Sequence, residues 1–255
     1  MHTKSFDKAI RKYGFLSDQK GILNRYLREK EQWEAHLLNT KNFILEEINE
    51  NINSIAVLGS GWLLDFPVEE VFNRNIQIDL YDLNHPKQIL HFIKRWKNVR
   101  AIKYDLTGGL IEFLVEKIKM KEPLEIDIIE EFLRETKPGF DQYSLVVSLN
   151  VLSQLSRLIE EKLLNKINLN FSVEKLRSII QTAHLESLPS GKSLIITDYE
   201  ENFLENNKII KTEKLLFCAD IFKGTDKKEW IWSFDTKKMY DLNYKTSMNV
   251  FAVKI

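Results

Sequence analysis

The residues of this sequence best suited to bind a ligand are a glycine-rich turn, Gly59-Ser60-Gly61, and the carboxylate of Asp82, which lies 21 residues further along. The turn follows a short apolar run at 55–58, which is typical of a buried strand. Glycine permits a positive φ and lets a ligand approach the bare backbone. A carboxylate about 20 residues beyond such a turn is placed to accept hydrogen bonds from ribose hydroxyls. Together the two features predict a site that binds a ribose.

Three further polar residues end apolar runs. Asp105 follows the run that starts at Val99, and its carboxylate could accept from an exocyclic amine such as that of adenine. The alternative for Asp105 is a cap for the helix that starts near Gly108. Asn150 and Asp198 end two later runs. Because open parallel sheets bind ligands at the carboxyl ends of their strands, these ends predict where the site lies.

The elements that must position these residues are strands alternating with helices. The expected strands are 54–58, 76–84, 99–109, 143–150 and 192–198, and helices are expected from Pro86 and over 110–119, 125–134, 156–166 and 172–187, the last with Ser172 as N-cap. This alternation predicts a parallel sheet covered by helices. Two more strands, 229–235 and 247–255, are joined by a polar link too short for a parallel crossover, which predicts an antiparallel pair. The stretch between 199 and 228 stays unassigned.

The N-terminal region is predicted to be helical over 17–49, with Ser17 as N-cap and a second helix after Thr40. Two roles are open for it: packing against one edge of the sheet, or walling a substrate site. Under the second role, Tyr13, Tyr26 and Trp33 could cover a substrate. The expected division is a helical cap at 1–51 and a main domain at 52–255.

Composition narrows the classes of partner. Lys+Arg and Asp+Glu both number 37, so no global positive field favours nucleic acid or anionic lipid. The single cysteine, Cys218, excludes an internal disulfide, and its apolar setting indicates a buried small hydrophobe. Five scattered histidines without metal-site spacing predict no metal. No apolar run approaches membrane-helix length, and no secretory signal is evident, so we expect a cytoplasmic protein that acts on a small molecule.

Five segments of the chain resemble successive motifs of one known family. They are IAVLGSG at 55–61, IDLYDLN at 78–84, IKYDLTG at 102–108, YSLVVSLNVLSQL at 143–155 and GKSLIITDYE at 191–200. They are similar to motifs of class I S-adenosylmethionine-dependent methyltransferases, and the C-terminal strand pair resembles the reversed hairpin of that family. The resemblance covers roughly 52–255. It implies an α/β fold with a Rossmann-like, doubly wound seven-stranded sheet, S-adenosylmethionine as cofactor, and methyl transfer to a small-molecule acceptor.

The resemblance also implies roles for individual residues. Gly59, Ser60 and Gly61 would line the methionine part of the cofactor, Asp82 would hold the ribose hydroxyls, and Leu83 would border the adenine. Asp105 would receive the adenine amino group, and Leu106 would donate to it from the backbone. Asn150 would lie beside the transferable methyl group, and Asn150 and Tyr199 are the candidate catalytic residues.

Two positions depart from the family pattern. Val57 stands where the family often has an acid, and Leu63 stands in place of a third glycine. Asp65 could supply the missing acid near the cofactor ammonium, or it could cap a short helix that begins near Pro67. Two other functions stay open. One is an NAD-binding Rossmann enzyme, although GxGxxG would need glycine at Leu64. The other is a non-catalytic cofactor-binding module on the same fold.

Overall fold

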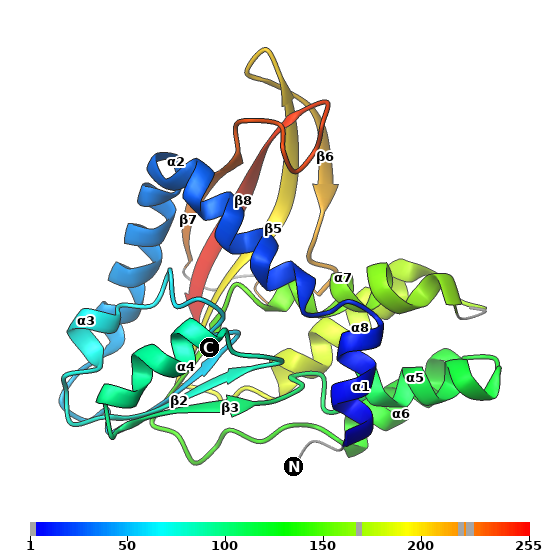
Figure 1. Ribbon diagram of the computed structural model, residues 1–255, viewed down its shortest axis with the longest axis horizontal. Coiled ribbons are helices and arrows are strands. Elements are labelled where there is room, and N and C mark those ends of the chain that lie inside the picture. The colour runs from blue at the N-terminus through cyan, green and yellow to red at the C-terminus, as the bar shows by residue number, and fades with distance from the viewer. Residues whose placement is uncertain (1–3, 167–169, 219–221, 223–226) are drawn as a thin grey trace.

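The computed structural model describes residues 4–166, 170–218, 222 and 227–255. These residues form an α/β fold around one sheet, with helices on both of its faces (Figure 1). The strand order is β3-β2-β1-β4-β5-β8-β7, and β6 pairs with β5 outside this path. The strands are β1 Ser54–Leu58, β2 Gln77–Asp82, β3 Val99–Lys103, β4 Leu145–Leu149, β5 Ser193–Glu205, β6 Lys208–Lys214, β7 Lys228–Asp235 and β8 Lys245–Lys254. The predicted doubly wound sheet is therefore confirmed, with one strand more than expected.

The first five strands pair in parallel, as the alternation of strands and helices predicted. In β1, Ala56 and Leu58 face one hydrophobic cluster, whereas Ile55 and Val57 face another. Side chains alternate between the two faces of a strand, so a strand covered on both faces reads as a continuous apolar run. That is why the parallel strands could be recognised from the sequence.

Helices of widely different length surround the sheet. They are α1 Lys4–Lys12, α2 Ser17–Glu47, α3 Val68–Val71, α4 Lys87–Phe92, α5 Leu110–Met120, α6 Ile126–Glu135, α7 Leu152–Leu163 and α8 Val173–Glu186, with 3-10 segments at Ile93–Arg95 and Leu164–Lys166. Ser172 caps α8 as predicted, because its side chain accepts a hydrogen bond from the Lys175 backbone N–H. Helix α7 begins at Leu152, directly after β4, and not at 156 as predicted. No helix among the described residues has the length and apolarity needed to cross a bilayer.

Helix α2 differs from the prediction in two respects. It continues through Thr40, which is fully buried, so the predicted second helix is the same helix. Ser17 does not cap it, because the Ser17 hydroxyl donates to the carbonyl of Gly14 outside the helix. The irregular point is Glu29, with φ −111° and ψ 19°. Its buried carboxylate accepts from Thr236 Oγ1 at 2.7 Å and from the Lys237 backbone N–H at 3.2 Å, so tertiary contacts fix this irregularity.

The C-terminal strands extend the sheet past the ends of β1 and β4. Strand β5 was expected to end at Asp198 but continues to Glu205 through an irregularity between Asp198 and Glu200. Strands β7 and β8 form the predicted antiparallel pair. Strand β6 lies in the unassigned stretch, and its side chains are all exposed, so no alternating pattern announced it. Helix α2 runs alongside this extension (Figure 1).

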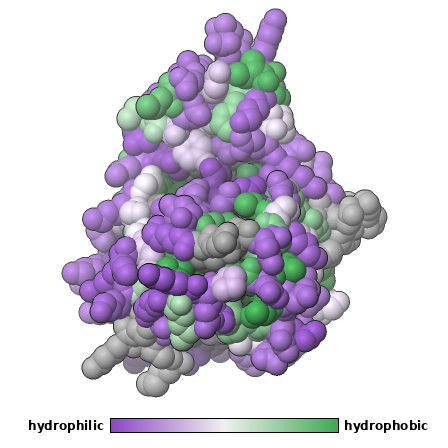
Figure 2. All heavy atoms as spheres, turned by 90° about the vertical axis from the view of Figure 1, so that its right-hand side faces the viewer, coloured by the Kyte–Doolittle hydropathy of each residue, from purple (hydrophilic) through white to green (hydrophobic). Residues whose placement is uncertain are grey.

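The outer surface is more hydrophilic than the layers of side chains packed around the sheet. Figure 2 shows one face of the molecule, on which hydrophilic side chains surround smaller hydrophobic areas. The large buried side chains gather in two clusters, one on each face of the sheet. The fold thus leaves the carboxyl ends of the parallel strands, with α2 beside them, as the place where a site can form.

Candidate functional site

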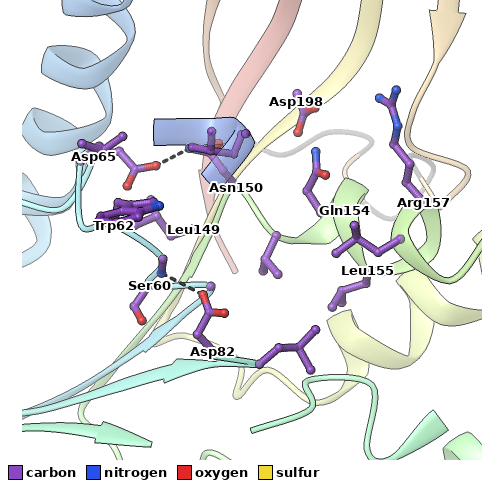
Figure 3. Close-up of a pocket in the computed structure, with 18 of the residues that line it drawn as sticks. Ser60, Trp62, Asp65, Asp82, Leu149, Asn150, Gln154, Leu155, Arg157 and Asp198 are labelled. Carbon is purple, nitrogen blue, oxygen red and sulfur yellow. Dashed lines mark hydrogen bonds between the residues drawn. The ribbon is translucent and has the colours of Figure 1, made fainter. Parts of the chain in front are cut away.

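A cavity of about 380 Å³ lies at the carboxyl ends of β1, β2 and β4, with α2, α7 and β7 around it (Figure 3). The order of the parallel strands reverses between β1 and β4, and such a switch point is where open α/β sheets bind ligands. Every residue expected to bind the cofactor lines this cavity: Gly59, Ser60, Gly61, Asp82, Leu83, Asp105, Leu106 and Asn150. The structure therefore brings together residues that are up to 91 positions apart in the sequence.

The other predicted residues are placed less uniformly. Tyr199 is not among the residues that line the cavity; its ring packs against that of Phe251, with 5.7 Å between the ring centroids. Trp33 lines the cavity, whereas Tyr13 and Tyr26 do not. Of the three aromatic residues expected to cover a substrate, only Trp33 lies where it could do so.

The glycine-rich turn is held by β2. The backbone N–H groups of Gly59 and Ser60 both donate to the Tyr81 carbonyl, at 2.9 and 3.2 Å. Gly59 has φ +81°, and a Cβ there would lie 2.8 Å from Val151 Cβ and 2.9 Å from the Leu149 carbonyl oxygen. Gly61 has φ +44°, but its nearest such contact is 3.8 Å. Both glycines adopt a left-handed backbone, and Gly59 also lacks room for any side chain.

Asp82 binds the turn directly. Its Oδ2 accepts from the Gly61 backbone N–H at 2.8 Å, drawn as the dashed line at Asp82 in Figure 3. Its Oδ1 accepts from the Asn84 backbone N–H at 3.2 Å. The same carboxylate lines the cavity and is only partly buried. Asp82 therefore fixes the shape of the turn and also presents negative charge to a ligand.

The backbone is left-handed at Leu63, the residue in place of the third glycine. Leu63 takes φ +57°, and its N–H donates to the Ser60 carbonyl at 2.9 Å. A left-handed conformation costs a non-glycine residue roughly 1–2 kcal/mol. The Leu63 side chain is buried against the α2 face of the sheet, which contributes about 1.5–3 kcal/mol in return. The turn thus has a left-handed conformation at position 63 without glycine.

The structure excludes one of the two roles predicted for Asp65. It does not cap α3, whose N-cap residue, Pro67, has no side-chain cap hydrogen bond. Instead Asp65 lines the cavity, and its Oδ2 accepts from Asn150 Nδ2 at 2.6 Å (Figure 3). Burial raises the pKa of the Asp65 carboxyl. An acid thus lies in the cavity even though Val57 is fully buried inside the sheet.

His36 of α2 is a cavity residue that the sequence did not reveal. It is 1% exposed, and its ring stacks on Trp232 with 4.0 Å between centroids. Trp230 Nε1 donates to His36 Nδ1 at 3.0 Å, and an indole N–H can only donate, so Nε2 must carry the ring proton. Burial lowers the pKa of His36 to about 3, so the ring is neutral near pH 7. Asn150 Nδ2 and His36 Nε2, 3.4 Å apart, are therefore both N–H donors and form no hydrogen bond with each other.

Two other acids of the cavity are engaged locally. Asp105 Oδ1 accepts from the backbone N–H and the hydroxyl of Thr107, at 2.9 and 2.5 Å. Asp105 is not the N-cap residue of α5, which is Gly109, although its Oδ2 accepts from the Ile111 backbone N–H in the first turn at 3.4 Å. Asp105 also lines the cavity. Asp198 is buried and accepts from Ser153 Oγ at 2.5 Å, and burial raises the pKa of its carboxyl. Among the described residues, no group of three or more His, Cys, Asp and Glu side chains could hold a metal ion.

Comparison with known proteins gives matches among solved structures. No family model matches the chain, and no curated protein matches it. The 1,6-didemethyltoxoflavin-N1-methyltransferase of Burkholderia thailandensis, solved with 1,6-didemethyltoxoflavin and S-adenosylhomocysteine, is 11% identical, with 93% of this chain and 87% of that chain covered and a TM-score of 0.43. A complex of DhpI with SAM and HEP is 7% identical, with 98% and 99% covered and a TM-score of 0.41. Precorrin-6y C5,15-methyltransferase from Geobacter metallireducens is 11% identical, with 87% and 86% covered and a TM-score of 0.35.

Proposed function

We propose that this protein binds S-adenosylmethionine in the cavity at the strand switch point and transfers its methyl group to a small-molecule acceptor. The observation that carries the proposal is the convergence of the Gly59-Ser60-Gly61 turn with Asp82, Asp105 and Asn150 around one cavity. These groups suit a nucleoside with an amino-acid tail. The glycine backbone can accommodate the tail, the carboxylate at the end of the second strand can accept from ribose hydroxyls, and the acid after the third strand can accept from an amino group of the base. The domain limits 1–51 and 52–255 and a cytoplasmic location belong to the same proposal.

Features of the turn support the fit of this cofactor. The space beside Gly59 is filled by Leu149 and Val151, whereas a Cβ on Gly61 would meet nothing closer than 3.8 Å, so a ligand could approach the bare backbone at Gly61. The Ser60 hydroxyl is buried and has no hydrogen-bond partner among the described residues, which leaves it able to bind a polar group of the ligand. We assign Asp82 to the ribose hydroxyls, Leu83 and Leu106 to the adenine, and Asp105 to the adenine amino group.

The negative charge of Asp65 and the exclusion of water from the cavity would suit the methyl transfer. S-adenosylmethionine is a cation at sulfur and at its amino group, and it supplies an activated methyl group when bound. The Asp65 carboxylate would offset that positive charge, held in place by Asn150. Trp33, His36 and Trp232 wall the other side of the cavity and would exclude water from the reacting atoms. Positioning in such a pocket accounts for much of the rate in a displacement of this kind, so no dedicated base is required.

Calorimetric titration tests the proposal against its alternatives. We expect S-adenosylmethionine and S-adenosylhomocysteine to bind at one site per chain, and NAD to bind much more weakly or not at all. Tight binding of NAD alone would favour the Rossmann oxidoreductase instead. Binding without any methylated product, when the labelled cofactor is incubated with small-molecule extracts, would favour the non-catalytic module.

A further inference from the structure

Two arginines line the cavity, and they differ in how their charge is satisfied. Arg157 of α7 donates from Nε to Glu161 at 3.0 Å and from Nη1 to Glu201 at 3.3 Å, and Nη2 donates to the Tyr240 hydroxyl. Arg25 of α2 makes no hydrogen bond and no ion pair with any described residue, and its Nε is buried without a partner. Arg25 is half-buried, and a guanidinium N–H that is buried away from water needs a partner, so Arg25 has hydrogen-bonding capacity left to satisfy in this cavity.

Aromatic side chains hold the Arg25 guanidinium in place. Its central carbon lies 4.4 Å from the Phe234 ring centroid and 4.6 Å from that of Tyr240. Stacking on ring faces fixes the plane of the guanidinium but uses none of its N–H groups. Burial lowers the pKa of Arg25, and the charges of Arg28 and Arg157 act in the same direction.

The acid whose charge acts on Arg25 is Asp235, and one of its two carboxylate oxygens is already engaged. Asp235 is fully buried and makes no ion pair with Arg25. Its Oδ2 accepts from the backbone N–H groups of Met239 and Tyr240, at 2.7 and 2.9 Å, and its Oδ1 has no hydrogen-bond partner among the described residues. Its charge therefore acts on Arg25 only through space. The guanidinium is held rigidly at the cavity wall, and an anion that enters the cavity can still meet its unused N–H groups.

We propose that Arg25 binds an oxyanion, a carboxylate or a phosphate, carried by the methyl acceptor. The aromatic wall beside it suits a flat apolar body: Phe234 stacks on Trp33 at 5.8 Å and meets Trp232 edge to face at 4.8 Å. This assignment rests on the proposed function for the identity of the acceptor, but the anion site itself does not depend on it. The acceptor is thus a small, flat molecule with one anionic group, whose reactive atom points from Arg25 toward Asn150.

The test uses benzoate, phenyl phosphate and the neutral isostere benzamide as probes, titrated by ligand-observed NMR with and without saturating S-adenosylhomocysteine. We expect at least one anion to bind with a Kd of about 1–10 mM or better and about tenfold more tightly than benzamide. Arg25→Gln should remove that preference, and Arg25→Lys should keep part of it. Arg28→Gln is the matched control, because Arg28 lies on the same helix, also has a buried Nε without a partner, and does not line the cavity.

The outcomes separate this inference from the proposed function. Preference for benzoate or for phenyl phosphate identifies the oxyanion as carboxylate or phosphate. Equal binding of benzamide, absence of anion binding at about 10 mM, or an anion preference that survives Arg25→Gln in a folded protein would overturn the inference. Loss of the preference in Arg28→Gln as well would also overturn it. S-adenosylhomocysteine binding is read in the same samples, so a protein that binds the anion but not the cofactor would contradict the proposed function alone.

Discussion

Gly59 and Gly61 both have positive φ, yet the structure predicts very different costs for adding one methyl group to each. A Cβ at Gly59 would lie 2.8 Å from Val151 Cβ and 2.9 Å from the Leu149 carbonyl oxygen. The left-handed backbone costs alanine roughly 1–2 kcal/mol, and overpacking adds about 1–3 kcal/mol. Gly59→Ala should therefore lower the free energy of unfolding by about 2–5 kcal/mol. At Gly61 only the conformational cost of roughly 1–2 kcal/mol applies, because the nearest contact is 3.8 Å.

Urea unfolding followed by tryptophan fluorescence measures these differences, and Gly21→Ala supplies the control. Gly21 lies inside α2, where a Cβ meets nothing within 4 Å, so alanine should stabilise the protein by up to about 1 kcal/mol. The same chemical change is thus expected to give a large loss, a small loss and a small gain at the three positions. A Gly59→Ala protein as stable as the Gly61→Ala protein would refute the assigned packing of the turn.

Three further predictions concern charged groups. Asp82→Ala should weaken S-adenosylhomocysteine binding at least tenfold, measured by calorimetry, because charge-assisted hydrogen bonds contribute about 1.5–3 kcal/mol. It should also lower the melting temperature, because the Gly61 backbone N–H loses its acceptor. Unchanged affinity would remove Asp82 from the site. Asp65→Asn keeps the contact with Asn150 but loses the charge, so it should weaken S-adenosylmethionine binding. A larger loss of affinity for S-adenosylmethionine than for S-adenosylhomocysteine would place Asp65 near the sulfonium. Unchanged affinity for both ligands would contradict the role of Asp65. His36 and His184 are buried and neutral, with pKa values lowered to about 3 and about 4, so the unfolded chain binds protons that the folded chain does not. The free energy of unfolding should consequently fall by about 1.4 kcal/mol per pH unit for each histidine as the pH drops below about 6.5 toward those values. Measured by denaturation between pH 7 and 4.5, the free energy of unfolding should depend less steeply on pH in His36→Asn than in the exposed control His91→Asn. Equal pH dependence in the two variants would show that His36 is not held neutral.

The parallel strands and their polar ends could be predicted because burial on both faces leaves an unmistakable apolar run. Chain topology then carries the ends of β1, β2 and β4 to one edge, so Gly59, Asp82 and Asn150 meet without further information. The ligand-binding half of the site is thus encoded locally, at a few strand ends. Whether Asp65 would cap a helix or face the cavity depended on the three-dimensional path of the turn.

The opposite half of the cavity could not be predicted, because its contacts join distant parts of the chain. His36 meets Trp230 from 194 positions away, and Trp33 Nε1 donates to the Phe234 carbonyl across 201 positions. Nothing in the periodicity of α2 distinguishes a cavity-facing Arg25 from a solvated one. The predicted helix break at Thr40 was wrong because buried contacts outweigh the weak helix propensity of threonine.

A crystal structure with S-adenosylhomocysteine tests most directly the central claim that the cavity at the strand switch point holds the cofactor. We predict that the ribose hydroxyls lie within hydrogen-bond distance of the Asp82 carboxylate, that the adenine lies between Leu83 and Leu106, and that the homocysteine tail crosses the turn at Gly59 to Gly61. Density for the ligand elsewhere on the molecule, or an adenine placed away from Asp82 and Asp105, would contradict the account.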